Sequence, residues 1–312
     1  MSSVEIRDAS KWYGAVIGVN EVTLDFGPGI TGLLGPNGAG KSTLMKLIVG
    51  LLRPSLGEVR VGGLPVWGSP AARRRIGFSP ETDGFYEEMD GRDFLRTLGR
   101  LSGLSARQAA GRTEEVLAEV GMKDLAGKRL RSCSKGMRQR IKLAQALVHD
   151  PEVIVLDEPL TGVDPMGRED LMAFFRRLGA SGRTVIISTH IIQELEGITD
   201  RIVLMARGRV LAAGTVGAIR GLMDEHPLTV RITSGRAREV AADLVGLEEV
   251  AGVALGEDGT DLIVKVRRPE RFFRALPRIL LARGAAVERI EPLDASAEAV
   301  FEYLVGPGGG TL

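Results

Sequence analysis

The chain has 312 residues, of which 44% are hydrophobic and 26% charged, so it is long enough for about two domains that each bury a core. A formal net charge of +1 excludes a global electrostatic attraction to nucleic acid or anionic lipid, and an aromatic content of 4% argues against a base-stacking surface. The single cysteine, Cys133, excludes an internal disulfide and indicates a reducing compartment.

The most apolar stretches, at residues 153–156 and 185–187, are only as long as strands and end in polar residues. A transmembrane helix needs about 20 mostly apolar residues in a row, so we expect no membrane span. The first residues lack the basic leader and apolar core of a signal peptide. Any association with a membrane is therefore expected to pass through a partner protein.

Up to about residue 220, short apolar runs alternate with helical periodicities, which is typical of an α/β fold with a largely parallel sheet. Residues 22–26 alternate like a half-exposed strand, and residues 30–34 are predicted to form a buried strand that runs into a glycine-rich loop. A helix with one apolar face is predicted after this loop, because apolar residues follow at i, i+3, i+4 and i+7. These residues are Leu44, Leu47, Ile48 and Leu51.

The region from about residue 90 to 128 has a helical period and is expected to be interrupted at three glycines, Gly103, Gly111 and Gly121. Buried strands are predicted at three later apolar runs: residues 153–156, 184–188 and 201–205.

The composition changes near Arg220, and a linker is predicted at residues 221–227. Residues 1–220 are therefore predicted to form one domain, with a helical subdomain at about 89–130, and residues 228–312 a second, smaller domain. No residue cluster in the second domain has catalytic or metal-ligand spacing. Our hypothesis is that this domain helps two copies of the chain to dimerise.

The pattern of the second domain predicts a ferredoxin-like α+β arrangement, βαββαβ with a final helix. The strands are expected at residues 228–232, 250–254, 262–266 and 286–290, and the helices at 237–245, 271–283 and 296–304. The second and third strands are expected to form a hairpin around Glu257, Asp258 and Gly259. Residues 306–310 are expected to be a frayed tail.

Residues 35–43 match the pattern G-x-x-x-x-G-K-[ST] and lie between a predicted strand and a predicted helix, as a phosphate-binding loop requires. Glycines allow backbone N–H groups to converge on phosphate oxygens, and the helix N-terminus adds to the attraction. Lys41 is expected to reach the β- and γ-phosphates of ATP, and the Ser42 hydroxyl to bind Mg²⁺. The loop consists of Gly35, Pro36, Asn37, Gly38, Ala39, Gly40, Lys41, Ser42 and Thr43.

Two carboxylates end the apolar run at residues 153–156. Asp157 is placed to hold Mg²⁺, mostly through water. Glu158 is placed to polarise the attacking water as a general base. Such a pair alone is usually a solvated strand end, and the phosphate loop upstream favours metal-assisted phosphoryl transfer instead.

Four further segments resemble motifs of the ABC ATPase family. Residues 132–140, Ser-Cys-Ser-Lys-Gly-Met-Arg-Gln-Arg, resemble the signature motif. Residues 160–164, which end at Asp164, resemble the D-loop, and residues 187–190 resemble the switch strand that ends in a histidine, here His190. Tyr13 matches the aromatic residue that stacks on adenine. The resemblance covers about residues 3–218, and the motifs occur in the family's order.

This resemblance implies an α/β fold of the P-loop NTPase, ABC ATPase type with a helical subdomain, beside the small ferredoxin-like domain. It also implies a head-to-tail homodimer in which each ATP lies between the phosphate loop of one copy and the signature of the other. His190 would sense the γ-phosphate, and Asp164 would lie near the nucleotide. The signature residues expected at the nucleotide are Ser134, Lys135, Gly136 and Met137.

Three residues depart from the family's usual pattern. Glu81 stands where the Q-loop usually has Gln, and we expect it to bind Mg²⁺ and orient water. Lys135 and Met137 stand where the signature usually has Gly and Gln; the Lys135 ammonium either offsets phosphate charge or, as we favour, points to solvent. The departures resemble ABC-2-type exporter ATPases, the daunorubicin-exporter-like and copper-maturation-related groups.

The segment 84–90 places aromatic and acidic residues just after the Q-loop, and in the family this neighbourhood, here about 81–90, receives the membrane subunits. Phe85 and Tyr86 either form part of that docking surface or pack inside the helical subdomain; both readings are open. The resemblance implies an integral-membrane permease as partner, no nucleic acid, and a cytoplasmic location at the inner face of the cell membrane.

The expected function is ATP hydrolysis that drives transport, with export favoured, through a separate membrane subunit. One alternative is a soluble ABC ATPase that acts on ribosomes or DNA; such relatives usually carry two ATPase domains or a long coiled-coil insertion, and this sequence shows neither. Another is a regulatory module that binds nucleotide but hydrolyses it poorly. The presence of both Glu158 and His190 argues against the second alternative.

Overall fold

The computed structural model describes residues 3–219, 228–256 and 258–293. The chain divides into two compact units, Met1–Val216 and Gly217–Leu312, which are described separately below. The predicted linker at 221–227, the predicted final helix at 296–304 and the predicted tail at 306–310 lie outside the described residues.

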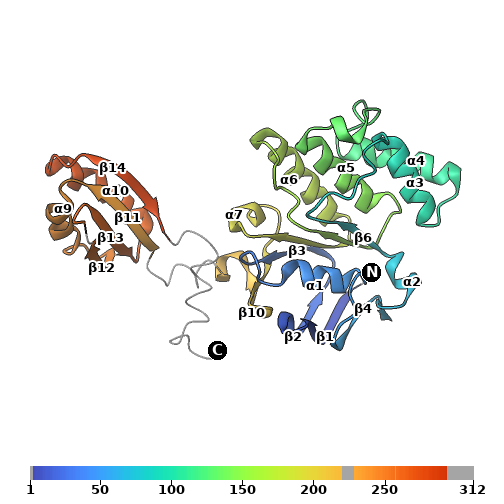
Figure 1. Cartoon of the computed structure of the whole chain (residues 1–312), viewed down its shortest axis with the longest axis horizontal. Helices are drawn as coiled ribbons and strands as arrows, with labels where there is room; N and C mark the ends of the chain where they lie inside the picture. Colours follow the sequence, from blue (N-terminus) through green and yellow to red (C-terminus); the bar gives the residue numbers. More distant parts are fainter. Residues whose placement is uncertain (1–2, 220–227, 257, 294–312) are drawn as a thin grey trace. The chain divides into compact units, whose positions relative to one another are not determined.

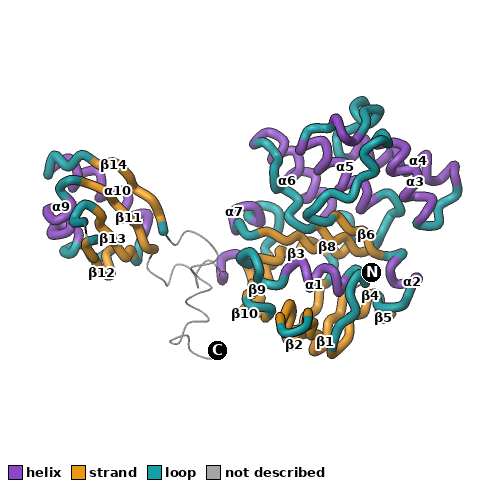
Figure 2. Tube along the Cα trace, in the orientation of Figure 1, coloured by secondary structure: helices purple, strands orange, loops and turns teal. Residues whose placement is uncertain are grey.

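The first unit contains two β-sheets (Figures 1 and 2). The smaller sheet has the order β2-β1-β4-β5, and every pair in it is antiparallel. Its strands are β1 (Val4–Tyr13), β2 (Val16–Phe26), β4 (Leu56–Val61) and β5 (Leu64–Pro65).

The larger sheet has the order β10-β9-β3-β8-β7-β6, and every pair is parallel except β9 with β10. Its strands are β3 (Gly29–Leu34), β6 (Ile76–Ser79), β7 (Val153–Leu156), β8 (Thr184–Thr189), β9 (Arg201–Ala206) and β10 (Arg209–Thr215). The buried strands predicted at 30–34, 153–156, 184–188 and 201–205 are confirmed. The parallel pairing places the carboxyl ends of β3, β8, β7 and β6 along one edge.

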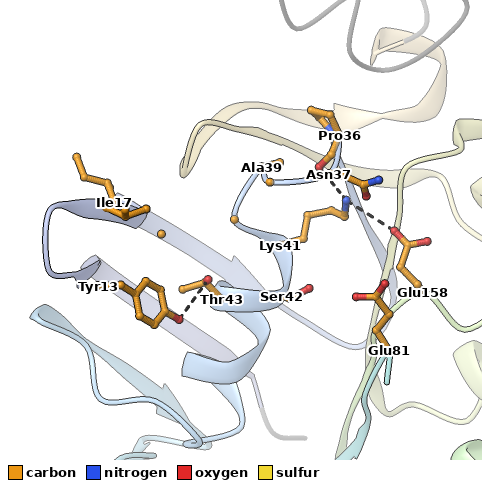
Figure 3. A pocket seen from close by; sticks show the side chains of 14 residues that line it. Tyr13, Ile17, Pro36, Asn37, Ala39, Lys41, Ser42, Thr43, Glu81 and Glu158 are labelled. Atoms are coloured by element: carbon orange, nitrogen blue, oxygen red, sulfur yellow. Dashed lines mark hydrogen bonds and ion pairs between the residues drawn. The ribbon is translucent and has the colours of Figure 1, made fainter. Parts of the chain in front are cut away.

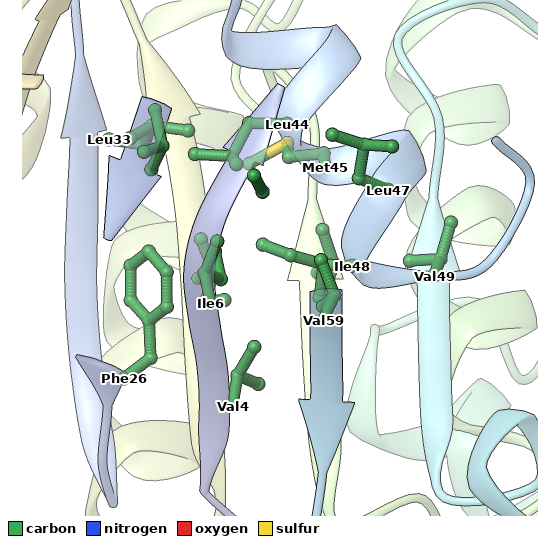
Figure 4. Close-up of a cluster of buried hydrophobic side chains, with 14 of the residues drawn as sticks. Val4, Ile6, Phe26, Leu33, Leu44, Met45, Leu47, Ile48, Val49 and Val59 are labelled. Carbon is green, nitrogen blue, oxygen red and sulfur yellow. The ribbon is translucent and has the colours of Figure 1, made fainter. Parts of the chain in front are cut away.

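Helix α1 (Lys41–Ile48) lies between the two sheets (Figure 4). Its buried Leu44, Leu47 and Ile48 belong to one core with apolar residues of both sheets. The prediction that Leu51 continues this apolar face was wrong, because the helix ends at Ile48 and Leu51 is 60% exposed. Gly50, with φ at 73°, turns the chain before Leu51.

The remaining helices of the first unit are mostly opened by a side-chain cap, which satisfies N–H groups that no helical carbonyl can reach. Asp90, Ser105, Ser134 and Asp164 cap α3, α4, α5 and α6 in this way. The helices are α2 (Pro70–Arg73), α3 (Gly91–Leu101), α4 (Ala106–Glu119), the 3₁₀ turn η1 (Leu130–Ser132), α5 (Lys135–Leu147), α6 (Pro165–Ala180) and α7 (Ile192–Leu195).

The predicted interruptions at Gly103 and Gly121 are confirmed, since both glycines have positive φ angles after a helix. The predicted interruption at Gly111 was wrong, because this glycine lies inside α4. An interior glycine costs about 1 kcal/mol relative to alanine. The capping box of Ser105 and Gln108 and the burial of one helix face offset that cost.

The second unit has the order βαββαβ that the sequence predicts, in a sheet of order β12-β13-β11-β14 with antiparallel pairs. The elements are β11 (Leu228–Ser234), α9 (Ala237–Leu244), β12 (Val250–Leu255), β13 (Asp261–Val266), α10 (Pro269–Ala282) and β14 (Val287–Pro292). Both helices contribute to a core of its own that includes Val230, Val240 and Phe272. In the described part of the chain, no helix combines the length and apolarity required to cross a bilayer.

Candidate active site

Several of the predicted site residues follow four neighbouring strands, at the carboxyl ends of the strands of the larger sheet. Gly35 follows β3, His190 follows β8, Asp157 and Glu158 follow β7, and Glu81 comes two residues after β6. Ligands of open α/β sheets bind outside the carboxyl ends of the strands. The sheet order therefore gathers these side chains although the sequence separates them widely.

The phosphate loop has a shape that requires glycine. Gly38 and Gly40 have φ angles of 80° and 100°, which side chains rarely tolerate. A Cβ atom on Gly40 would also lie 2.4 Å from the carbonyl oxygen of Gly18. Gly40 opens α1 without a side-chain cap, so the first N–H groups of the helix remain available to an anion.

A cavity of about 500 Å³ lies beside this loop (Figure 3). It brings the loop together with Tyr13 of β1, Glu81 after β6 and Glu158 after β7. The cavity is lined by Tyr13, Val16, Ile17, Gly18, Pro36, Asn37, Gly38, Ala39, Gly40, Lys41, Ser42, Thr43, Glu81 and Glu158.

Lys41 is buried at the end of this cavity, with 6% of its side chain exposed. Its Nζ donates to the carbonyl oxygens of Gly35 at 2.5 Å and Pro36 at 3.1 Å, and lies 3.7 Å from Oε1 of Glu158. Burial lowers the pKa of Lys41, and the charge of Glu158 acts against that shift. The ammonium is thus held by groups that a phosphate oxygen can replace.

Glu158 is held in a strained backbone conformation, with φ at 47°. Its N–H donates to Ser188 Oγ at 2.9 Å, and His190 Nδ1 lies 3.2 Å from both carboxylate oxygens. Burial raises the pKa of Glu158, and the hydrogen bond from His190 and the charge of Lys41 oppose that rise. A raised pKa brings a carboxylate closer to the basicity that general-base catalysis needs near neutral pH.

Ser188 links the carboxylate of Asp157 to the backbone of Glu158, a role that the sequence did not indicate. Its hydroxyl donates to Asp157 Oδ1 at 2.6 Å and accepts the Glu158 N–H. All three residues are buried. Ser188 lies beside the end of β7 because β8 pairs with β7. A single sequence does not specify which strands pair, so this contact could not be predicted from it.

The oxygen donors expected at a metal fit Mg²⁺, which prefers hydroxyl and carboxylate oxygens together with water. Ser42 and Glu81 line the cavity, and Asp157 is oriented by Ser188 behind it. Ser42 and Asp157 would hold the ion, with Glu81 as an additional carboxylate. The metal roles of these residues remain predictions.

Tyr13 forms the opposite end of the cavity, with 46% of the residue exposed. Its hydroxyl lies 3.4 Å from Thr43 Oγ1, and its ring passes close to Gly18, where a Cβ atom would lie 2.7 Å from the ring edge. Val16 and Ile17 extend this apolar wall and were not identified from the sequence. An exposed aromatic face next to the phosphate loop suits stacking on a base.

The predicted signature residues do not line this cavity. Ser134 caps α5, its Oγ accepting the Met137 N–H at 3.3 Å, and Asp164 caps α6, its Oδ1 accepting the Gly167 N–H at 3.0 Å. The two caps are neighbours, because a Cβ atom on Gly136 would lie 4.0 Å from Asp164 Oδ2. The signature residues and Asp164 thus form a second group at the start of α5, in which Ser134, Lys135 and Asp164 are exposed.

The sequence left two alternatives open, one for the direction of Lys135 and one for the packing of Phe85 and Tyr86. Lys135 is exposed, with its stem beside Gly162. Phe85 is half-buried and packs edge-on against Phe94 at 5.2 Å, whereas Tyr86 is 65% exposed. Phe85 therefore packs inside the helical region, and Tyr86 remains at the surface.

The sequence is similar to a family model and to curated proteins. A family model described as ABC transporter matches residues 19–161. The daunorubicin resistance ATP-binding protein DrrA3 of Streptomyces coeruleorubidus is 33% identical over 307 residues, 98% of this chain and 96% of that protein. The Nod factor export ATP-binding protein I of Rhizobium sp. (strain N33) is 34% identical over 308 residues, 97% of each chain.

The fold is similar to solved structures. An ATP-binding subunit of an ABC transporter gives a TM-score of 0.64 at 32% identity, covering 70% of this chain and 92% of that one. A dimeric ATP-binding cassette in a post-hydrolysis state with ADP and Pi gives a TM-score of 0.64 at 23% identity, covering 68% of this chain and 98% of that one. The second likeness concerns the fold alone.

Proposed function

Because the chain belongs to the ABC transporter family of ATP-binding proteins, and is an ATPase of that family, we propose that it drives export through a separate membrane subunit. The observation that supports this most directly is the cavity that joins the phosphate loop, Glu81 and Glu158. Its relatives include proteins named for daunorubicin resistance and for Nod factor export. An exporter-type ATP-binding subunit accounts for both the site and the relatives.

We propose that ATP binds with its base against Tyr13 and its phosphates in the loop that precedes α1. Lys41 exchanges its bonds to the Gly35 and Pro36 carbonyls for phosphate oxygens, which are stronger, charge-assisted partners. Mg²⁺, when bound, would neutralise part of the phosphate charge. Glu158 accepts the proton of the attacking water, and His190, at 3.2 Å, orients that carboxylate and reaches toward the γ-phosphate.

We propose that two copies of the chain bind ATP head to tail. Ser134 and the start of α5 are exposed and lie outside the chain's own cavity, so a second copy is needed to bring them to a nucleotide. A helix N-terminus attracts an anion such as the γ-phosphate. Hydrolysis then removes the group that bridges the two copies, and they separate.

The first test is hydrolysis and association by the purified full-length chain. We expect the purified chain to hydrolyse MgATP. When the chain is purified from its own cells, we expect a polytopic membrane protein to co-purify with it, bound through the cytoplasmic face of that protein. Tyr86 and the acidic residues near it, within 81–90, are the proposed docking surface for that subunit. Retention of ribosomes or DNA in place of a membrane protein would contradict the transport function and support a soluble ABC ATPase.

The second unit is proposed to assist dimerisation. It has a separate core and sheet, so a chain that ends at Arg220 retains the whole first unit. We expect that shortened chain to dimerise with ATP more weakly than the full chain in light-scattering measurements. Equal dimerisation by the two chains would refute this role.

A further inference from the structure

Two cations on α5 hold the loop that carries Glu81. Arg138 and Lys142 are four residues apart and therefore lie on one face of the helix. Both contact the segment from Pro80 to Glu87, here named the Q-loop segment. The same helix begins at Ser134, so it joins the loop to the exposed signature residues.

Lys142 is buried, with 4% of its side chain exposed. Its Nζ donates to the carbonyl oxygens of Pro80 at 3.1 Å and Glu81 at 2.7 Å, and lies 3.3 Å from Asp83 Oδ1. An ammonium has three donors, and these three oxygens satisfy them. The backbone on which Glu81 stands is thus fixed directly to α5.

Arg138 holds the far end of the same segment. It donates to Asp83 at 2.6 Å and to both carboxylate oxygens of Glu87, at 2.7 and 2.9 Å, and it lies 4.8 Å from the Phe85 ring centre. Burial alone would raise the pKa of Asp83, but the hydrogen bonds and charges of Arg138 and Lys142 outweigh it and keep that pKa below its usual value. Asp83 therefore stays ionised between the two cations.

The strand before the segment is also in close contact with α5. A Cβ atom on Gly77 of β6 would lie 1.8 Å from the carbonyl oxygen of Ala146, so the helix backbone lies directly against the strand. The strand is thus packed on α5 at Gly77, and the segment that follows is bonded to α5 by Lys142 at its beginning and by Arg138 at its end. Close-packed interiors are poorly compressible, so a displacement of the segment is transmitted to α5.

We propose that Lys142 is a positioning residue that locks the Q-loop segment to the signature helix, so that Glu81 in the chain's own cavity and Ser134 at the dimer surface move as one body. The inference rests on the proposed function, in which Ser134 serves the nucleotide of the opposing copy. Binding of ATP at one site then places Ser134 for the other site. The two sites of a dimer are coupled through this lock.

The test uses Lys142→Met in the full-length chain, which keeps the stem of the side chain and removes its three donors. Binding of ATP without Mg²⁺ by the isolated copy should change by less than about twofold, because Lys142 does not line the cavity and the phosphate loop and Tyr13 are unchanged. In a Glu158→Gln background, the MgATP concentration for half-maximal dimerisation should rise by about 5- to 150-fold, the range of typical coupling between sites. With Glu158 intact, the Hill coefficient of ATP hydrolysis should fall toward one.

Arg112→Met is the matched control. Arg112 also donates to a carbonyl of α5, that of Leu147 at 3.3 Å, but at the opposite end of the helix from Ser134. Within the described part of the chain, Arg112 forms no hydrogen bond or ion pair with the Q-loop segment, so Arg112→Met should leave both the dimerisation midpoint and the Hill coefficient unchanged. A general loss of helix stability would affect the two variants alike.

If Lys142→Met does not fold, as judged by circular dichroism, Asp83→Asn tests the inference in its place. It weakens the link to both cations while leaving the two carbonyl bonds of Lys142 in place, so a smaller shift in the same direction is expected. Values for the folded variants that equal those of Arg112→Met would overturn the inference and leave the proposed function standing. A Glu158→Gln parent that stays monomeric in MgATP would overturn the proposed function, and the inference with it.

Discussion

Helices α1 and α5 of the first unit differ at their N-termini. The difference agrees with the roles proposed for them, in which α1 binds the phosphates in the chain's own cavity and α5 contacts the nucleotide of an opposing copy. Helix α1 begins at Gly40 without a side-chain cap, inside a cavity lined by charged groups. Helix α5 begins at Ser134, which caps the helix itself, at an exposed surface. The start of α1 is surrounded by the other residues that line the cavity, whereas the start of α5 lies outside that cavity.

The charged side chains around the N-termini of α1 and α5 also differ, in their burial and in their partners. Beside α1, Lys41 and Glu158 are buried and bonded within the chain. Beside α5, Lys135 is exposed, and Asp164 caps its own helix. In the proposed mechanism the cavity supplies the groups for hydrolysis, whereas the surface at the start of α5 acts on the nucleotide of an opposing copy. Four predictions test the roles proposed for these two regions.

The largest effect is expected inside the cavity. Glu158→Gln removes the proposed base, and we expect kcat to fall by about 10²- to 10⁴-fold, the usual contribution of general-base catalysis. ATP binding should be retained, because the phosphate loop is unchanged. Glu119→Gln, an exposed carboxylate at the end of α4, is the control and should hydrolyse ATP at the normal rate. Normal turnover by Glu158→Gln would remove this residue from the mechanism.

The pH profile is expected to report the same carboxylate. Burial raises the pKa of Glu158, and only the ionised form accepts a proton, so kcat should fall as the pH drops through that raised pKa. Below it the fall should be about tenfold per pH unit. His190→Ala removes a hydrogen bond that lowers the pKa, so its acidic limb should lie at a higher pH than that of the natural chain. Coincident limbs would contradict the contact as the cause.

A smaller effect is expected at the start of α5. Ser134→Ala should weaken ATP-dependent dimerisation by about 10- to 150-fold, the loss of one charge-assisted hydrogen bond of about 1.5–3 kcal/mol. It should also lower stability by about 1 kcal/mol, as the loss of an N-cap does. Ser105→Ala removes the cap of α4 and provides the matched control, with a similar loss of stability and unchanged dimerisation. Equal dimerisation by the two variants would mean that Ser134 acts only as a cap.

The smallest effect is expected at the end of the cavity where Tyr13 lies, opposite Lys41. Tyr13→Phe keeps the ring and loses the 3.4 Å contact with Thr43, so the KM for ATP should change by less than about threefold, within one weak hydrogen bond. Tyr13→Ala should raise KM by more, since stacking on a base contributes about 1–3 kcal/mol. Equal KM values for the two variants would show that the ring does not contact the base.

The apolar strands and the phosphate loop could be predicted because their signals are local. The strand at residues 4–13 was not predicted, although Val4, Ile6 and Ala9 are buried. A register shift between Ile6 and Ala9, where Asp8 has φ at 46°, breaks the alternation that marks a strand. Local patterns do not reveal a bulge of this kind.

The members of the candidate site were predicted individually, but their contacts were not. Glu158 was placed from the apolar run before it and the phosphate loop upstream, whereas Glu81 and His190 could be placed only through resemblance to a family. The bridge made by Ser188 and the lock made by Lys142 depend on which strand and helix lie side by side. Nothing in the local sequence around Lys142 distinguishes a buried lysine from an exposed one on the same helix.

The most direct measurement is an experimental structure of Glu158→Gln with MgATP. We predict two copies related head to tail, with each triphosphate contacted by Lys41 of one copy and Ser134 of the other. A structure in which ATP occupies the cavity while Ser134 of both copies remains remote from every phosphate would contradict the account.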